Sequence, residues 1–223
     1  MSKNIIVAID ESELTSLKNI IDSLDSDKCM IKIGSVAFNS IGHKSIFYAA
    51  QKGFEIFLDL KLHDIPNTVK KTIKGLVSLP IKMLTIHTSG GKDMMEAAME
   101  AVSGTNIKIF GVTALTSLSD DDTSDIFQRT TSEQVNAMLD LAESAVIDGV
   151  VCSPHELELV AQRGSLLSIT PGIRMQNSND DQKRVMTPKE AIQLGADYLV
   201  IGRPITSSTN IEESLNKIYE SIQ

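Results

Sequence analysis

The sequence FLDLKLHDIPNT, at residues 57–68, carries the strongest signal of how this chain folds. Leucines alternate there with Asp59 and Lys61, at the two-residue period of a β-strand. The leucines therefore face one side of the strand and the charged pair faces the other. Strand interiors rarely hold charged side chains, because removing such groups from water is costly. The pattern predicts a strand whose leucines pack against helices and whose charged pair faces a functional interior.

Short runs rich in β-branched residues alternate with helix-like patterns from end to end of the chain. Eight runs in 223 residues give about 28 residues per unit, which suits a closed (β/α)8 barrel. A doubly wound open sheet has units of similar length and is the second possibility. No linker divides the sequence, so one barrel domain of the phosphate-binding type is expected over residues 1–223. The predicted strands are Ile5–Asp10, Cys29–Gly34, Glu55–Leu62, Lys82–Thr88, Lys108–Leu115, Gly149–Ser153, Leu166–Ile173 and Tyr198–Ile205.

The composition limits the kinds of partner that the protein can have. The chain carries 21 Lys and Arg against 29 Asp and Glu, a net charge of −8. Such a chain is a poor candidate for binding nucleic acid or an anionic membrane, although a few local cations can still hold a small anion. The sequence has no signal-peptide pattern and no run of about 18 apolar residues. A cytoplasmic location is expected, with no nucleic-acid or membrane partner.

Charged residues recur near the carboxyl ends of the first three predicted strands. Asp10 ends the first strand, Lys32 lies in the second, and Asp59 and Lys61 lie in the third. An ion-pair network that only stabilises the barrel is one interpretation. Barrel enzymes build their active sites at these strand ends, so a catalytic cluster is the favoured interpretation.

A second group of motifs follows the seventh and eighth predicted strands, where barrels often bind phosphate. Gly202 would let the backbone approach a phosphate, and Arg203 would offer it several donors. The loops 116–131 and 174–186 are long enough to act as lids, and either can also be an ordinary surface loop. The second of these loops contains Gln182 and begins at Arg174.

These motifs together resemble the orotidine 5′-phosphate decarboxylase family. The matching stretches are VAID, IKIG, DLKLHDIPNT, IHTSGG, ALTS, TPGIR, DDQKRVMTP and IGRPI, which run in the family's order from residue 7 to residue 205. The resemblance implies a homodimeric (β/α)8 barrel that converts orotidine 5′-monophosphate to uridine 5′-monophosphate and carbon dioxide, the last step of de novo UMP synthesis. It implies neither a metal ion nor an organic cofactor.

The resemblance also implies roles for the charged cluster. Lys61 would donate a proton to C6 of the pyrimidine, and Asp59 would lie beside the departing carboxylate. Lys32 would join this network and contact the ribose. Asp64, together with Asp59, would favour the ammonium form of Lys61. The catalytic residues implied are therefore Lys32, Asp59, Lys61 and Asp64.

The remaining implied contacts are with the substrate. Asp64 and Thr68 would reach the active site of the partner subunit and touch the ribose there. Asp10 would contact the nucleotide, and Thr116 would lie beside the pyrimidine. The phosphate end would be lined by Arg174, Gln182, Gly202 and Arg203.

Two other functions remain open from the sequence. Magnesium-dependent sugar-phosphate aldolases and decarboxylases of the same barrel group resemble this chain at the Asp59 motif. They carry an acidic residue where this chain has Lys32, and an ammonium group there would oppose a divalent cation. A nucleotide-binding protein without catalysis is the other alternative, but the retention of Lys61 and the aspartates disfavours it.

Overall fold

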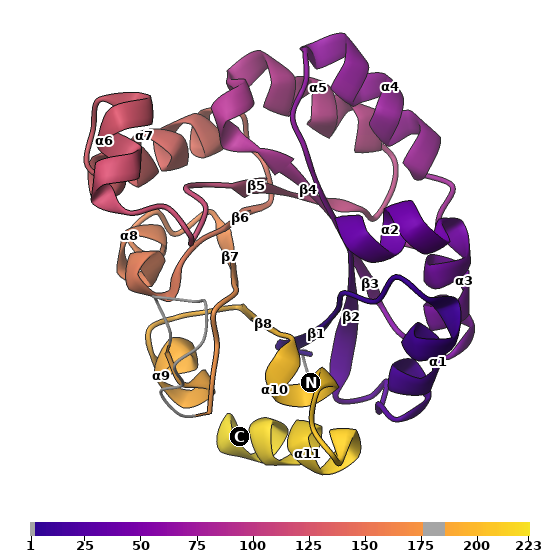
Figure 1. Cartoon of the computed structure of the whole chain (residues 1–223). Helices are drawn as coiled ribbons and strands as arrows, with labels where there is room; N and C mark the ends of the chain where they lie inside the picture. The colour runs from indigo at the N-terminus through magenta and orange to yellow at the C-terminus, as the bar shows by residue number, and fades with distance from the viewer. Residues whose placement is uncertain (1–2, 176–185) are drawn as a thin grey trace.

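The computed structural model of the chain describes residues 3–175 and 186–223, and over these residues eight parallel strands close into a barrel. Each strand pairs with its neighbour in sequence, and the last strand pairs with the first. Figure 1 shows the ring of strands with helices around it. The closed barrel is confirmed, and the open sheet is wrong. The strands are β1 (Ile5–Ile9), β2 (Cys29–Gly34), β3 (Ile56–Leu62), β4 (Met83–His87), β5 (Lys108–Val112), β6 (Gly149–Val151), β7 (Leu167–Thr170) and β8 (Tyr198–Ile201).

Helices follow the strands and cover the outside of the barrel (Figure 1). Among the described residues, no helix is long and apolar enough to cross a membrane. The α-helices are α1 (Leu14–Asp22), α2 (Ser35–Ile41), α3 (His43–Gln51), α4 (Pro66–Leu76), α5 (Lys92–Val102), α6 (Asp120–Phe127), α7 (Thr131–Ser144), α8 (Leu157–Ala161), α9 (Pro188–Gln193), α10 (Arg203–Thr206) and α11 (Ile211–Ser221). Short 3₁₀ turns lie at Thr88–Gly90 and Pro154–Glu156.

The apolar core has two layers, and strand alternation separates them. In β3, Leu58 belongs to the layer between the strands and the helices, and Phe57 belongs to the cluster inside the barrel. Lys32 and Asp59 are also buried, although both are charged. The inward-facing positions are thus apolar toward the amino ends of the strands and charged toward their carboxyl ends. This arrangement confirms the predicted orientation of the leucines.

Most of the predicted strands are longer than the observed ones. The last strand ends at Ile201, not Ile205, and Arg203–Thr206 forms α10 instead. Pro204 explains this, because proline has no N–H for a strand ladder but is well suited to the first turn of a helix. Of the other predicted strands, Cys29–Gly34 agrees with the structure and the rest are one to four residues too long.

The long loop predicted at residues 116–131 is also wrong, because it contains α6. Ser119 caps this helix: its side chain accepts a hydrogen bond from the Asp122 backbone, and the Asp122 carboxylate bonds back to Ser119. Three aspartates in the first turn stabilise the helix, because their negative charges lie near the positive end of the helix dipole. In the loop predicted at 174–186, residues 176–185 lie outside the described residues. Its flanks, Ile173 and Met186, are joined by a parallel bridge.

Candidate active site

The end of β3 departs from regular strand geometry at Lys61. The pairing with β4 shifts between Leu58 and Leu62, and Lys61 has a φ of 51°. A left-handed backbone costs a residue with a side chain roughly 1–2 kcal/mol. The Lys61 N–H donates to the Thr85 hydroxyl over 2.8 Å. Strain of this kind is concentrated at functional sites, and here it sets the direction of the Lys61 side chain.

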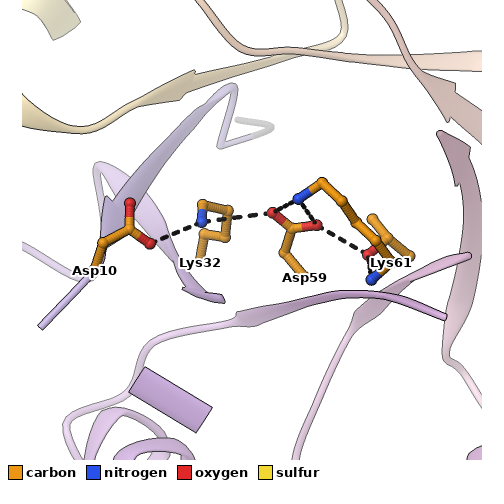
Figure 2. Close-up of polar contacts among 5 residues, drawn as sticks. Asp10, Lys32, Asp59 and Lys61 are labelled. Carbon is orange, nitrogen blue, oxygen red and sulfur yellow. Dashed lines mark hydrogen bonds and ion pairs between the residues drawn. The ribbon is translucent and has the colours of Figure 1, made fainter. Parts of the chain in front are cut away.

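Four charged side chains, one just after β1 and the others on β2 and β3, form one alternating chain (Figure 2). The Lys61 ammonium donates to both carboxylate oxygens of Asp59, each over 2.8 Å. The Lys32 ammonium lies 3.5 Å from Asp59 Oδ2 and 3.2 Å from Asp10 Oδ1. The order is therefore Asp10, Lys32, Asp59, Lys61, in which each charge has an opposite neighbour. The predicted cluster is brought together.

Burial differs along this chain of charges. The side chains of Asp59 and Lys32 are 9% and 11% exposed, whereas those of Lys61 and Asp10 are 36% and 58% exposed. Burial alone would raise the pKa of Asp59. The charges of Lys32 and Lys61, with hydrogen bonds from Lys61 and Thr85, outweigh it, so the pKa of Asp59 lies below its ordinary value. Asp59 is therefore a carboxylate at neutral pH.

Gly34, at the end of the IKIG motif, leaves room for this network. A Cβ atom there would lie 2.8 Å from the Lys32 ammonium and 3.1 Å from Asp10 Oδ1. Even alanine would therefore push Lys32 or Asp10 from its place. Sequence reasoning did not single out Gly34, because the need for space there arises only when Asp10, from the end of β1, meets Lys32 beside it.

A cavity of about 550 Å³ opens at the carboxyl ends of the strands. This volume is in the usual range for pockets that hold small organic ligands. It brings together predicted residues from both ends of the chain. They are Asp10, Lys32, Asp59, Lys61, Thr116, Arg174, Gly202 and Arg203.

Other lining residues were not predicted. Some are apolar residues that alternate inward on the strands, such as Phe57 and Val200, and this period could have revealed them. Thr206 was missed because α10 was not predicted, and Glu11 because it follows the strand end. The full set of unpredicted lining residues is Ala8, Glu11, Phe57, Val151, Pro171, Gly172, Val200, Thr206 and Ser207.

The cavity wall is more cationic than the chain as a whole. Four cationic residues line it, namely Lys32, Lys61, Arg174 and Arg203, against the carboxylates Asp10, Glu11 and Asp59. The wall therefore has a formal charge of 4 − 3 = +1, whereas the whole chain has −8. Within residues 3–175 and 186–223, no three His, Cys, Asp or Glu side chains are placed to hold a metal ion. The lining is thus suited to an anionic ligand.

A Cβ atom at Gly202, between β8 and α10, would not clash with other atoms of the protein. Gly202 has a negative φ of −104°, and a Cβ there would lie 3.6 Å from the Ala8 side chain, an ordinary contact. Arg203 follows at the start of α10, and Arg174 enters the cavity from the end of the β7 segment. Arg174 is 8% exposed, and its Nη1 donates to the Ile173 carbonyl over 3.0 Å.

Two of the predicted residues that the structure describes do not line the cavity within one chain. Asp64 is exposed, and its carboxylate accepts a hydrogen bond from the Ile65 N–H over 2.7 Å. Thr68 lies half-buried in the first turn of α4 and does not line the cavity. Gln182 lies outside the described residues.

Comparison with known proteins places this barrel in a family. The family model described as Orotidine 5′-phosphate decarboxylase / HUMPS family matches residues 3–218. The orotidine 5′-phosphate decarboxylase of Saccharophagus degradans is 44% identical over 220 residues, covering 96% of this chain and 92% of the relative. The protein of the same name from Wolbachia pipientis subsp. Culex pipiens is 43% identical over 221 residues, covering 98% of each.

A solved structure agrees with the sequence comparisons. The crystal structure of orotidine 5′-phosphate decarboxylase from Lactobacillus acidophilus matches with a TM-score of 0.88 at 33% identity, covering 100% of both chains. The resemblance seen in the motifs is thereby confirmed over nearly the whole length of the chain. The chain belongs to the orotidine 5′-phosphate decarboxylase / HUMPS family.

Proposed function

We propose that this protein decarboxylates orotidine 5′-monophosphate to uridine 5′-monophosphate, the last step of de novo UMP synthesis. The observation that carries this proposal is the alternating chain of Asp10, Lys32, Asp59 and Lys61 at one side of a cationic cavity. The names of the relatives described above agree with it.

Lys61 is the proposed proton donor. Cleavage of the bond between C6 and the carboxylate releases carbon dioxide and leaves the electron pair on C6, in an orbital that the ring does not delocalise. An ammonium group at that carbon stabilises the developing negative charge more than it stabilises the substrate, which lowers the barrier. A proton then passes from the Lys61 ammonium to C6, and solvent returns a proton to the lysine.

Asp59 and Lys32 prepare Lys61 for this step. Asp59 binds the Lys61 ammonium through both oxygens, which favours the charged form of the lysine and fixes its position. Asp59 then lies beside the departing carboxylate of the substrate. Lys32 balances the charge of Asp59 and contacts the ribose, and Asp10 contacts the nucleotide.

The other end of the cavity is the proposed phosphate site. Gly202 allows close approach of the backbone, and Arg203 and Arg174 offer donors to the phosphate oxygens. Gln182 is proposed to join them, and Thr116 to lie beside the pyrimidine. Because the phosphate is remote from C6, its binding energy serves to position the reacting carbon at Lys61.

The proposed active form is a homodimer of single-domain barrels that needs neither metal nor organic cofactor. Asp64 of each subunit is proposed to complete the charge network of the partner subunit, and Thr68 to touch the ribose there. The exposure of Asp64 within one chain supports this role, because the carboxylate is accessible to a second copy.

The metal-dependent alternative has less support. Lys32 places an ammonium group 3.5 Å from Asp59, in the position where such an enzyme needs a cation-binding carboxylate. The experiment is an ultraviolet assay for loss of orotidine 5′-monophosphate, with and without excess chelator. Loss of substrate at the same rate in both is expected. A requirement for magnesium, or absence of product, would contradict the proposal.

A further inference from the structure

Thr85, on β4, connects the two residues at the centre of the proposed mechanism. The residue is fully buried, with no exposed surface, and it does not line the cavity. Its hydroxyl accepts a hydrogen bond from the Lys61 N–H over 2.8 Å and donates one to Asp59 Oδ1 over 2.9 Å. A hydroxyl has a single proton, and a carboxylate can only accept, so the direction of both bonds is fixed.

The first of these bonds holds the irregular backbone of Lys61. The shift in pairing between β3 and β4 gives Lys61 a positive φ, and its N–H bonds to a side chain of β4 rather than to the β4 backbone. A buried N–H without a partner is costly, so the Thr85 hydroxyl makes this conformation possible.

The second bond orients the carboxylate. Asp59 Oδ1 receives both the Thr85 hydroxyl and the Lys61 ammonium, so one oxygen is fixed from two directions. The Thr85 hydroxyl therefore bridges the backbone N–H of Lys61 and the Asp59 carboxylate, which in turn binds the Lys61 ammonium. The position of the ammonium thus depends on Thr85 both through the Lys61 backbone and through Asp59.

We propose that Thr85 is a positioning residue for the decarboxylation, because its hydroxyl sets the geometry of Asp59 and Lys61 while making no contact with the cavity. This inference rests on the proposed function, since it assumes that Lys61 acts at C6. It also follows that the Thr85 hydroxyl helps to keep the pKa of Asp59 low, because it donates to the charged form.

The test compares Thr85→Val with Thr85→Ser. Valine keeps the branched shape and removes both hydrogen bonds, whereas serine keeps the hydroxyl. For Thr85→Val we expect kcat to fall roughly 10- to 100-fold, as for loss of a hydrogen bond to a charged group. We expect KM to change less than about threefold, because the phosphate contacts remain. Thr85→Ser is expected to stay within about threefold of the native kcat.

The pH profile gives a readout that a purely structural role would not change. Losing the donated hydrogen bond raises the pKa of Asp59, so the acid limb of kcat/KM in Thr85→Val moves to higher pH. Thr88→Val is the matched control: Thr88 is also fully buried, but its hydroxyl donates to the Val112 carbonyl over 2.8 Å. This control is expected to lose stability and to keep the native kcat and pH profile.

Three results would overturn the inference. These are a native kcat and pH profile in Thr85→Val, equal effects in Thr85→Val and Thr88→Val, and a change confined to KM. If Thr85→Val does not fold, Thr85→Ala removes the same hydroxyl and is judged by the same criteria. Lys61→Ala is measured alongside: native turnover in that variant would overturn the role proposed for Lys61 and this inference together, whereas no turnover by the native protein would overturn the proposed function itself. An inactive Lys61→Ala with a native Thr85→Val would overturn this inference alone.

Discussion

Replacing Asp59 with asparagine tests whether the carboxylate holds two lysines together. Asparagine keeps the shape and one acceptor oxygen but removes the charge. At an effective dielectric constant of about 20, the attraction of Asp59 is about 6 kcal/mol to Lys61 at 2.8 Å and about 5 kcal/mol to Lys32 at 3.5 Å. Most of this attraction is offset by the cost of removing the three charges from water.

The net loss is smaller and can be bounded from the geometry. Removing one member of a buried pair costs roughly 3–5 kcal/mol. Lys32 keeps Asp10 at 3.2 Å, and the Lys61 side chain is 36% exposed and can be hydrated, so both lysines lose less than fully buried ions would. We therefore expect Asp59→Asn to lower the free energy of unfolding by about 1–3 kcal/mol at pH 7. For a chain of this length, the melting temperature falls by roughly 2–12 °C.

The assay is urea and thermal unfolding of the native protein and of Asp59→Asn between pH 7 and pH 3. Because the pKa of Asp59 is lowered by folding, its ionisation stabilises the native protein above the unfolded pKa of about 3.9. This contribution is lost as the pH falls through the lower folded value, so the difference between the two proteins shrinks below about pH 4.

Asp197, a carboxylate far from the cavity, provides the matched control. Asp197 accepts a hydrogen bond from the Ser168 N–H over 2.7 Å at the opposite end of the barrel. Asp197→Asn is expected to lose stability while keeping full activity, whereas Asp59→Asn loses activity about 100-fold or more. Native stability of Asp59→Asn at pH 7, or a difference that does not change with pH, would refute the reasoning.

Three further predictions concern the phosphate end and the dimer. Arg203→Ala is expected to raise KM for the nucleotide roughly 10- to 150-fold, from loss of one or more charge-assisted hydrogen bonds, and to leave binding of the nucleoside without phosphate unchanged. An equal loss with the nucleoside, measured by titration, would contradict the assignment. Gly202→Ala is expected to bind inorganic phosphate more weakly, because the methyl group would limit the approach of a phosphate to the backbone, while within the protein a Cβ there meets only ordinary contacts. Native phosphate affinity would show that the glycine has another purpose. Mixing inactive Lys61→Ala with inactive Asp64→Ala is expected to restore activity, because one site of the mixed dimer is intact; no recovery after confirmed subunit exchange would oppose a shared site.

The barrel could be predicted because its signals are local. The alternation in β3 and the start of α9, with Thr187 capping and Pro188 in the first turn, are visible within a few residues. The convergence of Lys32 and Asp59 could also be expected, because the carboxyl ends of parallel strands meet at one end of a barrel.

The remaining features depend on contacts that single stretches of sequence do not show. The hydroxyl of Thr85 contacts Lys61 and Asp59 because the pairing register shifts between β3 and β4, and no periodic pattern in the sequence reveals that shift. Gly34 was missed for a similar reason, because its missing side chain makes room for the ion pair of Lys32 with Asp10, which comes from the end of β1. The acidic first turn of α6 resembles a solvated surface loop, so the sequence pattern does not reveal this helix.

The most direct test of the central claim is the turnover of Lys61→Ala, measured by loss of ultraviolet absorbance of orotidine 5′-monophosphate. Lys61 is assigned both the stabilisation of charge at C6 and the delivery of the proton, so kcat is expected to fall at least about 10³-fold. The phosphate contacts remain, so the variant is expected to retain binding of uridine 5′-monophosphate. Turnover within about tenfold of the native enzyme would contradict the account, because either assigned role alone contributes more than that.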